Sequence, residues 1–205
     1  MRVKLLAVSD EVVPWIHSAQ LVERCGDVDI ILGCGDLPSE YLEYITTMLG
    51  KPCFYVRGNH DQAQGHRPEG CVNLDLRAQR WGKLQLAGLE GGPLYKPGAP
   101  LQYSQNDQWL RAIWLACKVF PRRACRRRRV DIVISHAPLY GIHDGSDPAH
   151  IGFAAFNWLA RLLRPRLWLH GHQHRSYAPL QPRETRLGET LIVNVHPYRI
   201  LELSL

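Results

Sequence analysis

The chain has 205 residues, of which 45% are hydrophobic and 21% are charged, as is usual for a globular domain. The longest apolar runs are too short for a membrane span, and the run after Lys4 is too short for a signal peptide. The net charge of +6 is local, because six of the 25 Lys and Arg residues lie within residues 122–129 and the remaining 19 equal the number of Asp and Glu residues. This distribution argues against a basic nucleic-acid-binding surface over the whole domain.

Short and nearly continuous apolar runs, typical of strands buried on both faces, alternate with segments in which apolar residues recur at helical spacing. In chain order, the predicted elements are strand 3–8, helix 15–24, strand 28–33, helix 39–49, strand 52–56, strand 83–89, helix 105–119, strand 130–135, helix 151–164 and strand 166–170. This alternation predicts a layered α/β domain.

The C-terminal part of the chain has a different pattern, in which strand-like runs are joined by short links. These runs are 176–180, 189–195 and 198–205. Together with the strand at 83–89, they predict a second, partly antiparallel sheet that packs against the first, with helices outside. The Gly and Pro content of residues 90–104 predicts an ordered surface loop. There is no internal repeat and no linker, so we expect a single domain over residues 1–205.

Polar side chains that can bind metals follow five of the buried runs. They are Asp10; Asp36; Asn59, His60 and Asp61; His136; and His172 with His174. Ligands of layered α/β domains collect at the carboxyl ends of strands, so we expect these side chains to converge on one site. Carboxylate, amide and imidazole groups without a thiolate favour Mn, Fe, Zn or Co over a soft metal or an all-oxygen calcium site.

The motifs GD, GNHD, SHAP and GHQH, in this order after Asp10, resemble the signature of the calcineurin-like metallophosphoesterases. The resemblance extends from Asp10 to His174, which is most of the chain. It implies a four-layer αββα sandwich of two mixed β-sheets flanked by helices. It also implies two neighbouring divalent metal ions, which activate a water for the hydrolysis of phosphodiesters or phosphomonoesters.

The resemblance further implies which residues bind each ion. The carboxylate of Asp36 would bridge the two ions. The first ion would also be bound by Asp10 and His174. The ligands of the second ion would be the side chains of Asn59, His136 and His172.

His60 is the candidate general acid. Successive side chains diverge, so His60 cannot easily be a ligand if Asn59 is one. We expect it to donate to the leaving oxygen of the substrate, with Asp61 holding its ring. Arg57 can either reach the phosphate or be a surface charge, and the sequence favours neither. His143 is expected on the rim of the cleft in contact with substrate, although a simple polar turn is the alternative.

The first motif departs from the family pattern, which begins Asp-x-His, because this chain reads Asp10-Glu11-Val12. The first ion therefore loses one expected nitrogen ligand. Glu11 or a water can complete the shell, the first site can be weak, or the protein can work with one ion at the second site. Glu11 has the reach, but side chains alternate along an extended chain, so only a turn would bring it to the site. We expect a weakened first site rather than none, since Asp10 and His174 would otherwise have little purpose.

The leading hypothesis is a cytoplasmic, metal-dependent phosphoesterase with an open cleft and a phosphate-ester substrate. Six cysteines without a C-x-x-C pair are typical of reduced thiols, which supports the cytoplasm. One alternative is a scaffold or binding protein that has lost efficient catalysis through Val12. A second is a nuclease that uses the arginine tract at 122–129, although a solvated helix end is the favoured interpretation of that tract. His170 is expected in the core, and no role is assigned to His17, His66 or His196.

Overall fold

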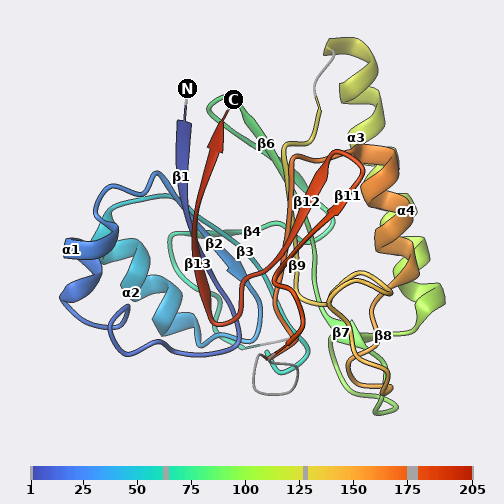
Figure 1. Cartoon of the computed structure of the whole chain (residues 1–205), viewed down its shortest axis with the longest axis horizontal. Helices are drawn as coiled ribbons and strands as arrows, with labels where there is room; N and C mark the ends of the chain where they lie inside the picture. Colours follow the sequence, from blue (N-terminus) through green and yellow to red (C-terminus); the bar gives the residue numbers. More distant parts are fainter. Residues whose placement is uncertain (1, 62–64, 127–128, 175–179, 205) are drawn as a thin grey trace.

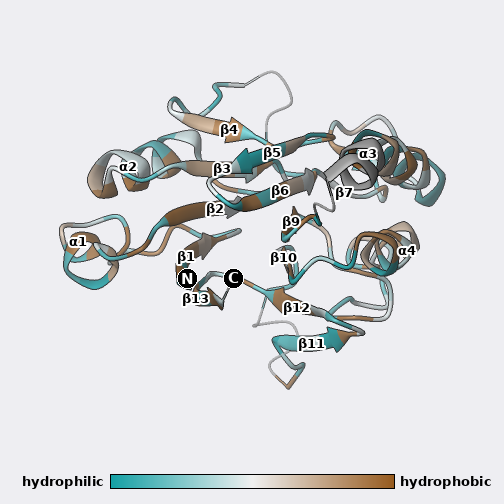
Figure 2. Ribbon diagram, turned by 90° about the horizontal axis from the view of Figure 1, so that it is seen from above, coloured by the Kyte–Doolittle hydropathy of each residue, from teal (hydrophilic) through white to brown (hydrophobic). Residues whose placement is uncertain are grey.

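The computed structural model describes residues 2–61, 65–126, 129–174 and 180–204, without the side chains of residues 120–126. Two mixed β-sheets lie face to face in the middle of the molecule, and helices cover the outer face of each sheet (Figure 1). Seen from above, the molecule has the layer order helix, sheet, sheet, helix (Figure 2). The predicted αββα sandwich is therefore confirmed.

The first sheet has the strand order β13-β1-β2-β3-β4. Its strands are β1 (Arg2–Val8), β2 (Ile30–Cys34), β3 (Cys53–Val56), β4 (Cys71–Asn73) and β13 (Tyr198–Ser204). β1 to β4 run parallel, and β13 pairs antiparallel with β1 in a register that sets Arg2 opposite Ser204. The helices beside this sheet are α1 (Gln20–Cys25) and α2 (Ser39–Leu49).

The second sheet has the strand order β11-β12-β10-β9-β6-β5. Its strands are β5 (Ala78–Trp81), β6 (Leu84–Leu89), β9 (Ile132–Ser135), β10 (Leu167–His170), β11 (Glu184–Leu187) and β12 (Thr190–Asn194). The four central strands are parallel, and β5 and β11 are antiparallel edge strands. Helices α3 (Gln105–Arg126) and α4 (Ala154–Leu163) lie beside this sheet, and β7 (Gly92–Pro93) pairs with β8 (Gln102–Tyr103) in a small separate ribbon.

Apolar side chains fill the spaces between the layers, and the two-residue period of each strand decides which space a side chain enters. In β1, Leu5 belongs to the cluster that also contains Leu86 and Ile134 of the second sheet. The next residue, Leu6, belongs to the cluster with Leu21 of α1. A further cluster packs the second sheet against α3 and α4. Burial on both faces explains why the strands read as nearly continuous apolar runs.

The structure corrects several expected elements. The predicted strand at 198–205 corresponds to β13, which joins the first sheet rather than the second, because it pairs with β1. The predicted loop at 90–104 contains β7 and β8, and β4, β5 and β11 were not expected. The predicted strand at 176–180 lies almost wholly outside the described residues. Helix α1 is shorter than the predicted 15–24, whereas α3 continues beyond 119, past Pro121.

Candidate metal centre

The carboxyl ends of strands from both sheets meet at one edge of the sandwich. The first sheet brings the residues after β1, β2 and β3, and the second sheet brings those after β9 and β10. The two sets are joined by hydrogen bonds, since the His172 N–H donates to both carboxylate oxygens of Asp10, each at 3.1 Å. The Asp10 N–H in turn donates to the Gly35 carbonyl at 3.1 Å. The predicted convergence of the strand ends is therefore present.

Two glycines allow the strand ends to approach closely. A Cβ atom at Gly171 would lie 1.8 Å from Ser9 Oγ and 2.5 Å from Asp10 Oδ2. A Cβ atom at Gly58 would lie 2.0 Å from Asp36 Oδ1. Because real Cβ atoms do not come so near to other atoms, only glycine fits at these two positions.

Three of the predicted ligands have a backbone conformation that non-glycine residues rarely adopt. The φ angles of Asp10, Asp36 and His172 are 67°, 55° and 68°. Left-handed conformations of this kind cost free energy and cluster at functional sites, where they direct side chains that a regular strand could not direct. Each of these residues turns its carboxylate or imidazole back toward the meeting point of the strands.

The second-ion ligands form a compact group around His136. Its Nε2 atom lies 3.2 Å from Asp36 Oδ2, 3.1 Å from Asn59 Oδ1 and 3.0 Å from His172 Nδ1. His136 is fully buried, and Asn59 and His172 are nearly so. The four side chains that the sequence assigned to this ion therefore meet at one point.

The hydrogen bonds on the far side of the two rings fix their tautomers. His136 Nδ1 lies 2.9 Å from the Cys34 carbonyl, and His172 Nε2 lies 2.7 Å from the Ala149 carbonyl. A carbonyl can only accept, so these nitrogens carry protons, and the facing His136 Nε2 and His172 Nδ1 atoms are the ones left to bind a metal ion once His136 Nε2 loses its own proton. Two imidazole lone pairs, a carboxylate oxygen and an amide oxygen then converge, which is a donor set that fits a divalent transition-metal ion.

The electrostatics of the group favour positive charge at the same point. Burial alone would lower the pKa of His136, but the neighbouring Asp36 carboxylate outweighs it and raises the pKa to about 9. Burial acts to raise the pKa of Asp36, yet His136 and the His60 N–H hold it below its ordinary value. Burial lowers the pKa of His172 to about 4, and His136 adds to the effect. A proton and a metal ion therefore compete for this position.

The first-ion ligands lie next to this group. His174 Nε2 is 3.6 Å from Asp10 Oδ1, and the interaction with Asp10 raises the pKa of His174. Val12 is 42% exposed and, as a valine, offers no ligand atom. Glu11, in contrast, is turned toward His174, whose Nδ1 lies 3.9 Å from Glu11 Oε1. The required turn is present, since the Glu11 N–H donates to the Ser9 carbonyl at 2.8 Å.

His196 also belongs to this region, although the sequence analysis gave it no role. Its Nε2 lies 3.1 Å from Glu11 Oε1, and its ring stacks on that of His174 with a centroid distance of 4.3 Å. Burial lowers the pKa of His196. It follows β12 closely, as the other candidate ligands follow their strands, so the same pattern of an apolar run ending in polar residues was present at 190–196.

His60 and Asp61 do not interact in the way that we expected. Asp61 accepts backbone hydrogen bonds from Gly58, Asp36 and Leu37 at 2.7–3.1 Å, and no contact with the His60 ring occurs among the described residues. Asp61 therefore braces the loop that presents Asp36. His60 is exposed, and its N–H donates to Asp36 Oδ1 at 2.8 Å.

A pocket of about 420 Å³ adjoins the metal ligands on the side of α2. Asp36 and His60 line it together with Leu37, Tyr55, Arg57 and Arg67. Arg57 is not a simple surface charge, because its guanidinium makes a two-point ion pair with buried Glu90, at 2.8 and 3.0 Å. This pair raises the pKa of Arg57. A contact between Arg57 and a phosphate stays a prediction.

His143 is placed differently from the expectation of a substrate-contacting rim residue. Its side chain is 3% exposed, with Nδ1 3.0 Å from His170 Nε2 and Nε2 2.8 Å from Thr185 Oγ1. Burial lowers its pKa to about 4. His143 therefore links three segments inside the protein, and His170 is the core residue that the sequence predicted.

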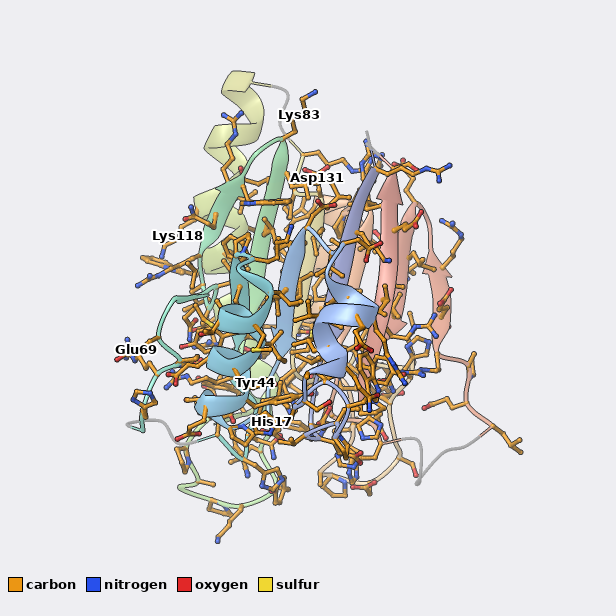
Figure 3. The ribbon with its side chains drawn as sticks, turned by 90° about the vertical axis from the view of Figure 1, so that its left-hand side faces the viewer. His17, Tyr44, Glu69, Lys83, Lys118 and Asp131 are labelled. Carbon is orange, nitrogen blue, oxygen red and sulfur yellow. The ribbon has the colours of Figure 1, made fainter. Side chains whose placement is uncertain are left out.

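The loop after β1 is held by helix α2. The Val13 N–H donates to Tyr41 Oη at 3.2 Å, which fixes the part of the loop next to Asp10 and Glu11. Farther along the chain, the His17 ring packs edge-on against Tyr44 with a centroid distance of 4.6 Å. Figure 3 shows His17 next to Tyr44, near the lower end of α2 in this view.

The chain belongs to the calcineurin-like phosphoesterase family, whose model matches residues 4–176. The family suggests metal-dependent hydrolysis of phosphate esters, and it includes catalytically inactive members. No curated protein sequence matches this chain. Among the described residues, no helix combines the length and apolar character that crossing a membrane requires.

Two solved structures from Thermus thermophilus share the fold. The protein TT1561 is 16% identical with a TM-score of 0.63, and the match covers 95% of this chain and 89% of that one. A 5'-nucleotidase precursor is 14% identical with a TM-score of 0.51, and the match covers 100% of this chain and 51% of that one. At these identities the likeness establishes the fold alone.

Proposed function

We propose that this protein hydrolyses phosphate esters with the help of two divalent transition-metal ions. The observation that carries the proposal is the convergence of four ligand side chains around His136 Nε2, where a metal ion would replace the proton. Two ions side by side would activate a water and neutralise the charge on the phosphoryl oxygens. Asp36 contributes a carboxylate to the group, and Asp61 keeps that carboxylate in place through the backbone of the Asp36 loop.

His60 is the proposed proton donor to the leaving oxygen. It is exposed beside Asp36 and lines the pocket of about 420 Å³, so a leaving group seated in the pocket would lie within its reach. Because the pocket is open to solvent and lined by both polar and apolar groups, it suits a phosphodiester or an exposed monoester. The 5'-nucleotidase precursor is only 14% identical to this chain, so the proposal takes no substrate from it.

The test is hydrolysis of bis(p-nitrophenyl) phosphate and p-nitrophenyl phosphate with added Mn²⁺, the ion that we propose as activating. His60→Gln is expected to lower kcat by about 10²–10⁴, the usual contribution of a general acid, with metal content unchanged. His136→Gln is expected to lose both metal and activity. Glu23→Gln, at an exposed residue of α1 that does not line the pocket, serves as the control.

Equal rates in wild type and His60→Gln, or activity that persists in excess EDTA, would contradict the proposal. Folded, metal-loaded protein without hydrolysis would favour the scaffold alternative. Activity on nucleic acid that falls steeply with salt, and loses this dependence when the arginines of tract 122–129 become alanine, would favour the nuclease alternative. The side chains of that tract, apart from Arg129, lie outside the described residues.

We also propose the cytoplasm as the compartment. Cys25, Cys34 and Cys53 are buried free thiols, and Cys71 and Cys117 are unpaired as well. Free thiols persist in reducing compartments. Fractionation with an antibody against the protein tests this proposal.

A further inference from the structure

The loop after β1 offers a carboxylate in place of the family's histidine. The family pattern Asp-x-His would put a nitrogen ligand at position 12, but here that position is Val12, which has no ligand atom. The left-handed turn at Asp10, with φ 67°, brings the side chain of Glu11 to the side of His174. Alternation of side chains along an extended strand would direct Glu11 away from the site, but the chain is no longer extended at Asp10, so the alternation ends there.

The missing nitrogen donor is available from another strand. β12 runs parallel to β10, and the register sets Asn194 opposite His170. The segments that follow therefore leave the second sheet side by side, one carrying His174 and the other His196. The Asn194 side chain joins them, because it donates to the Gln173 carbonyl at 2.8 Å and accepts from the His196 N–H at 3.0 Å.

The donor atoms lie at distances that suit a common ion. Glu11, His174 and His196 each offer an atom, and these atoms all lie within 4.8 Å of one another. An ion with bonds of about 2.1 Å holds its ligands roughly 3–3.5 Å apart, so these atoms must draw closer together. Asp10 Oδ1 lies 3.6 Å from His174 Nε2, whereas Glu11 Oε1 faces Nδ1, so the His174 ring must also turn before one of its nitrogens meets both carboxylates. Glu11 Oε1 and His196 Nε2, 3.1 Å apart, already meet this spacing.

We propose that Glu11 and His196 complete the first metal site together with Asp10 and His174, in place of the histidine absent from position 12. The inference deepens the proposed function, since it names the ligands of the first ion of the same centre. Two carboxylates neutralise a divalent cation, and two imidazoles favour Zn, Mn, Fe or Co over Ca or Mg. The first site is then a complete one with a different ligand set.

The experiment measures metal binding without reference to activity. Apoprotein is titrated with Zn²⁺ by calorimetry and with Co²⁺ by visible absorption, for wild type, Glu11→Gln and His196→Gln. Wild type is expected to bind two ions per chain. Each variant is expected to lose at least about 10-fold in affinity at one site, with the other site unchanged. Glu23→Gln, at an exposed residue of α1, is the matched control.

Unchanged stoichiometry and affinity in Glu11→Gln would overturn the proposal, as would a single bound ion in wild type that neither variant affects. Glu11 is exposed, so its variant tests the idea even if His196→Gln does not fold. The outcome is separate from that of the proposed function. If wild type binds two ions and both variants lose affinity, but no protein hydrolyses the substrates, the proposed hydrolase function is refuted and the ligand set stands. If wild type hydrolyses the substrates and both variants bind metal as wild type does, the ligand set is refuted and the hydrolase function stands.

Discussion

A side chain larger than hydrogen at Gly171 would collide with Ser9 and Asp10. Gly171→Ala is therefore expected to push β1 and β10 apart at the metal centre. We expect a loss of about 1–3 kcal/mol in the free energy of unfolding, as for overpacked cores, and a weaker first metal site. Urea unfolding and Zn²⁺ titration measure the two effects.

Gly82→Ala is the control for this substitution. Gly82 has a positive φ, of 56°, but a Cβ atom there meets nothing within 4 Å. The control should lose about 1 kcal/mol from backbone strain and keep its metal affinity. If both variants bind metal as wild type does, the close approach at Gly171 is not needed for the centre.

Restoring the family's histidine should have no effect in this chain. In the proposed ligand set, Glu11 and His196 already join Asp10 and His174 at the first ion. Val12→His is expected to leave Zn²⁺ affinity within about 2-fold of wild type, because four ligands already complete a tetrahedral shell. A large gain in affinity, seen by calorimetry, would show that position 12 still belongs to the site.

Individual residues were predictable when they directly follow a buried run, whereas the position of Glu11 was not. The positions of Asp36, Asn59, His136 and His172 followed from their place after buried runs. The role of Glu11 depends on the positive φ of Asp10, which a non-glycine residue rarely adopts and no local pattern indicated. Asp61 was expected to hold the His60 ring, but its partners are backbone N–H groups. Every residue except proline has such a group, so no sequence pattern indicates these contacts.

The buried contacts of His143 join the segment after β9 to strands β10 and β11. Burial lowers the pKa of His143 to about 4, whereas an unfolded histidine has a pKa of about 6.5. The unfolded chain thus binds more protons below pH 6.5, and stability falls as the pH drops from there toward 4. We expect the titration of His143 to lower the free energy of unfolding by about 1 kcal/mol when the pH falls from 7.5 to 5.5.

Urea midpoints in EDTA at the two pH values measure this loss. His143→Gln can keep hydrogen bonds to its neighbours but does not titrate, so its stability should depend less on pH than that of wild type. Identical pH dependence in wild type and His143→Gln would contradict the prediction.

Secondary-structure elements were predictable when they are long and buried. The runs behind β1, β2, β3, β9 and β10 were recognised because both faces are apolar. β5 and β11 are edge strands with partly exposed side chains, so their sequences show no continuous apolar run. The pairing of β13 with β1 could not be inferred, because the apolar pattern of a strand indicates which of its faces is buried but not which neighbouring strand it pairs with.

At the scale of the whole molecule, the metal ligands come from both sheets. Asp10, Asp36 and Asn59 follow strands of the first sheet, and His136 and His172 follow strands of the second. A bound ion therefore ties the two halves of the sandwich together and binds the folded state only. At a concentration 100 times the dissociation constant, each ion should add about 2.7 kcal/mol, or roughly 5–10 °C in Tm.

Calorimetric melting in EDTA and in excess Zn²⁺ measures this effect. Glu11→Gln should show a smaller rise than wild type, because one of its two sites is weakened. A Tm that does not respond to metal in wild type would mean that the ligands do not bind an ion in the folded protein.

The place of His196 in the chain has a consequence for biosynthesis. The ligands assigned to the second ion are all translated by residue 172, whereas the proposed ligand set of the first ion also includes His196, between β12 and β13. The Ser9 N–H, next to Asp10, pairs with the carbonyl of Pro197, so this contact of the loop after β1 also waits for the end of the chain. In the proposed centre, the loop that is translated first therefore depends on residues that are translated nearly last.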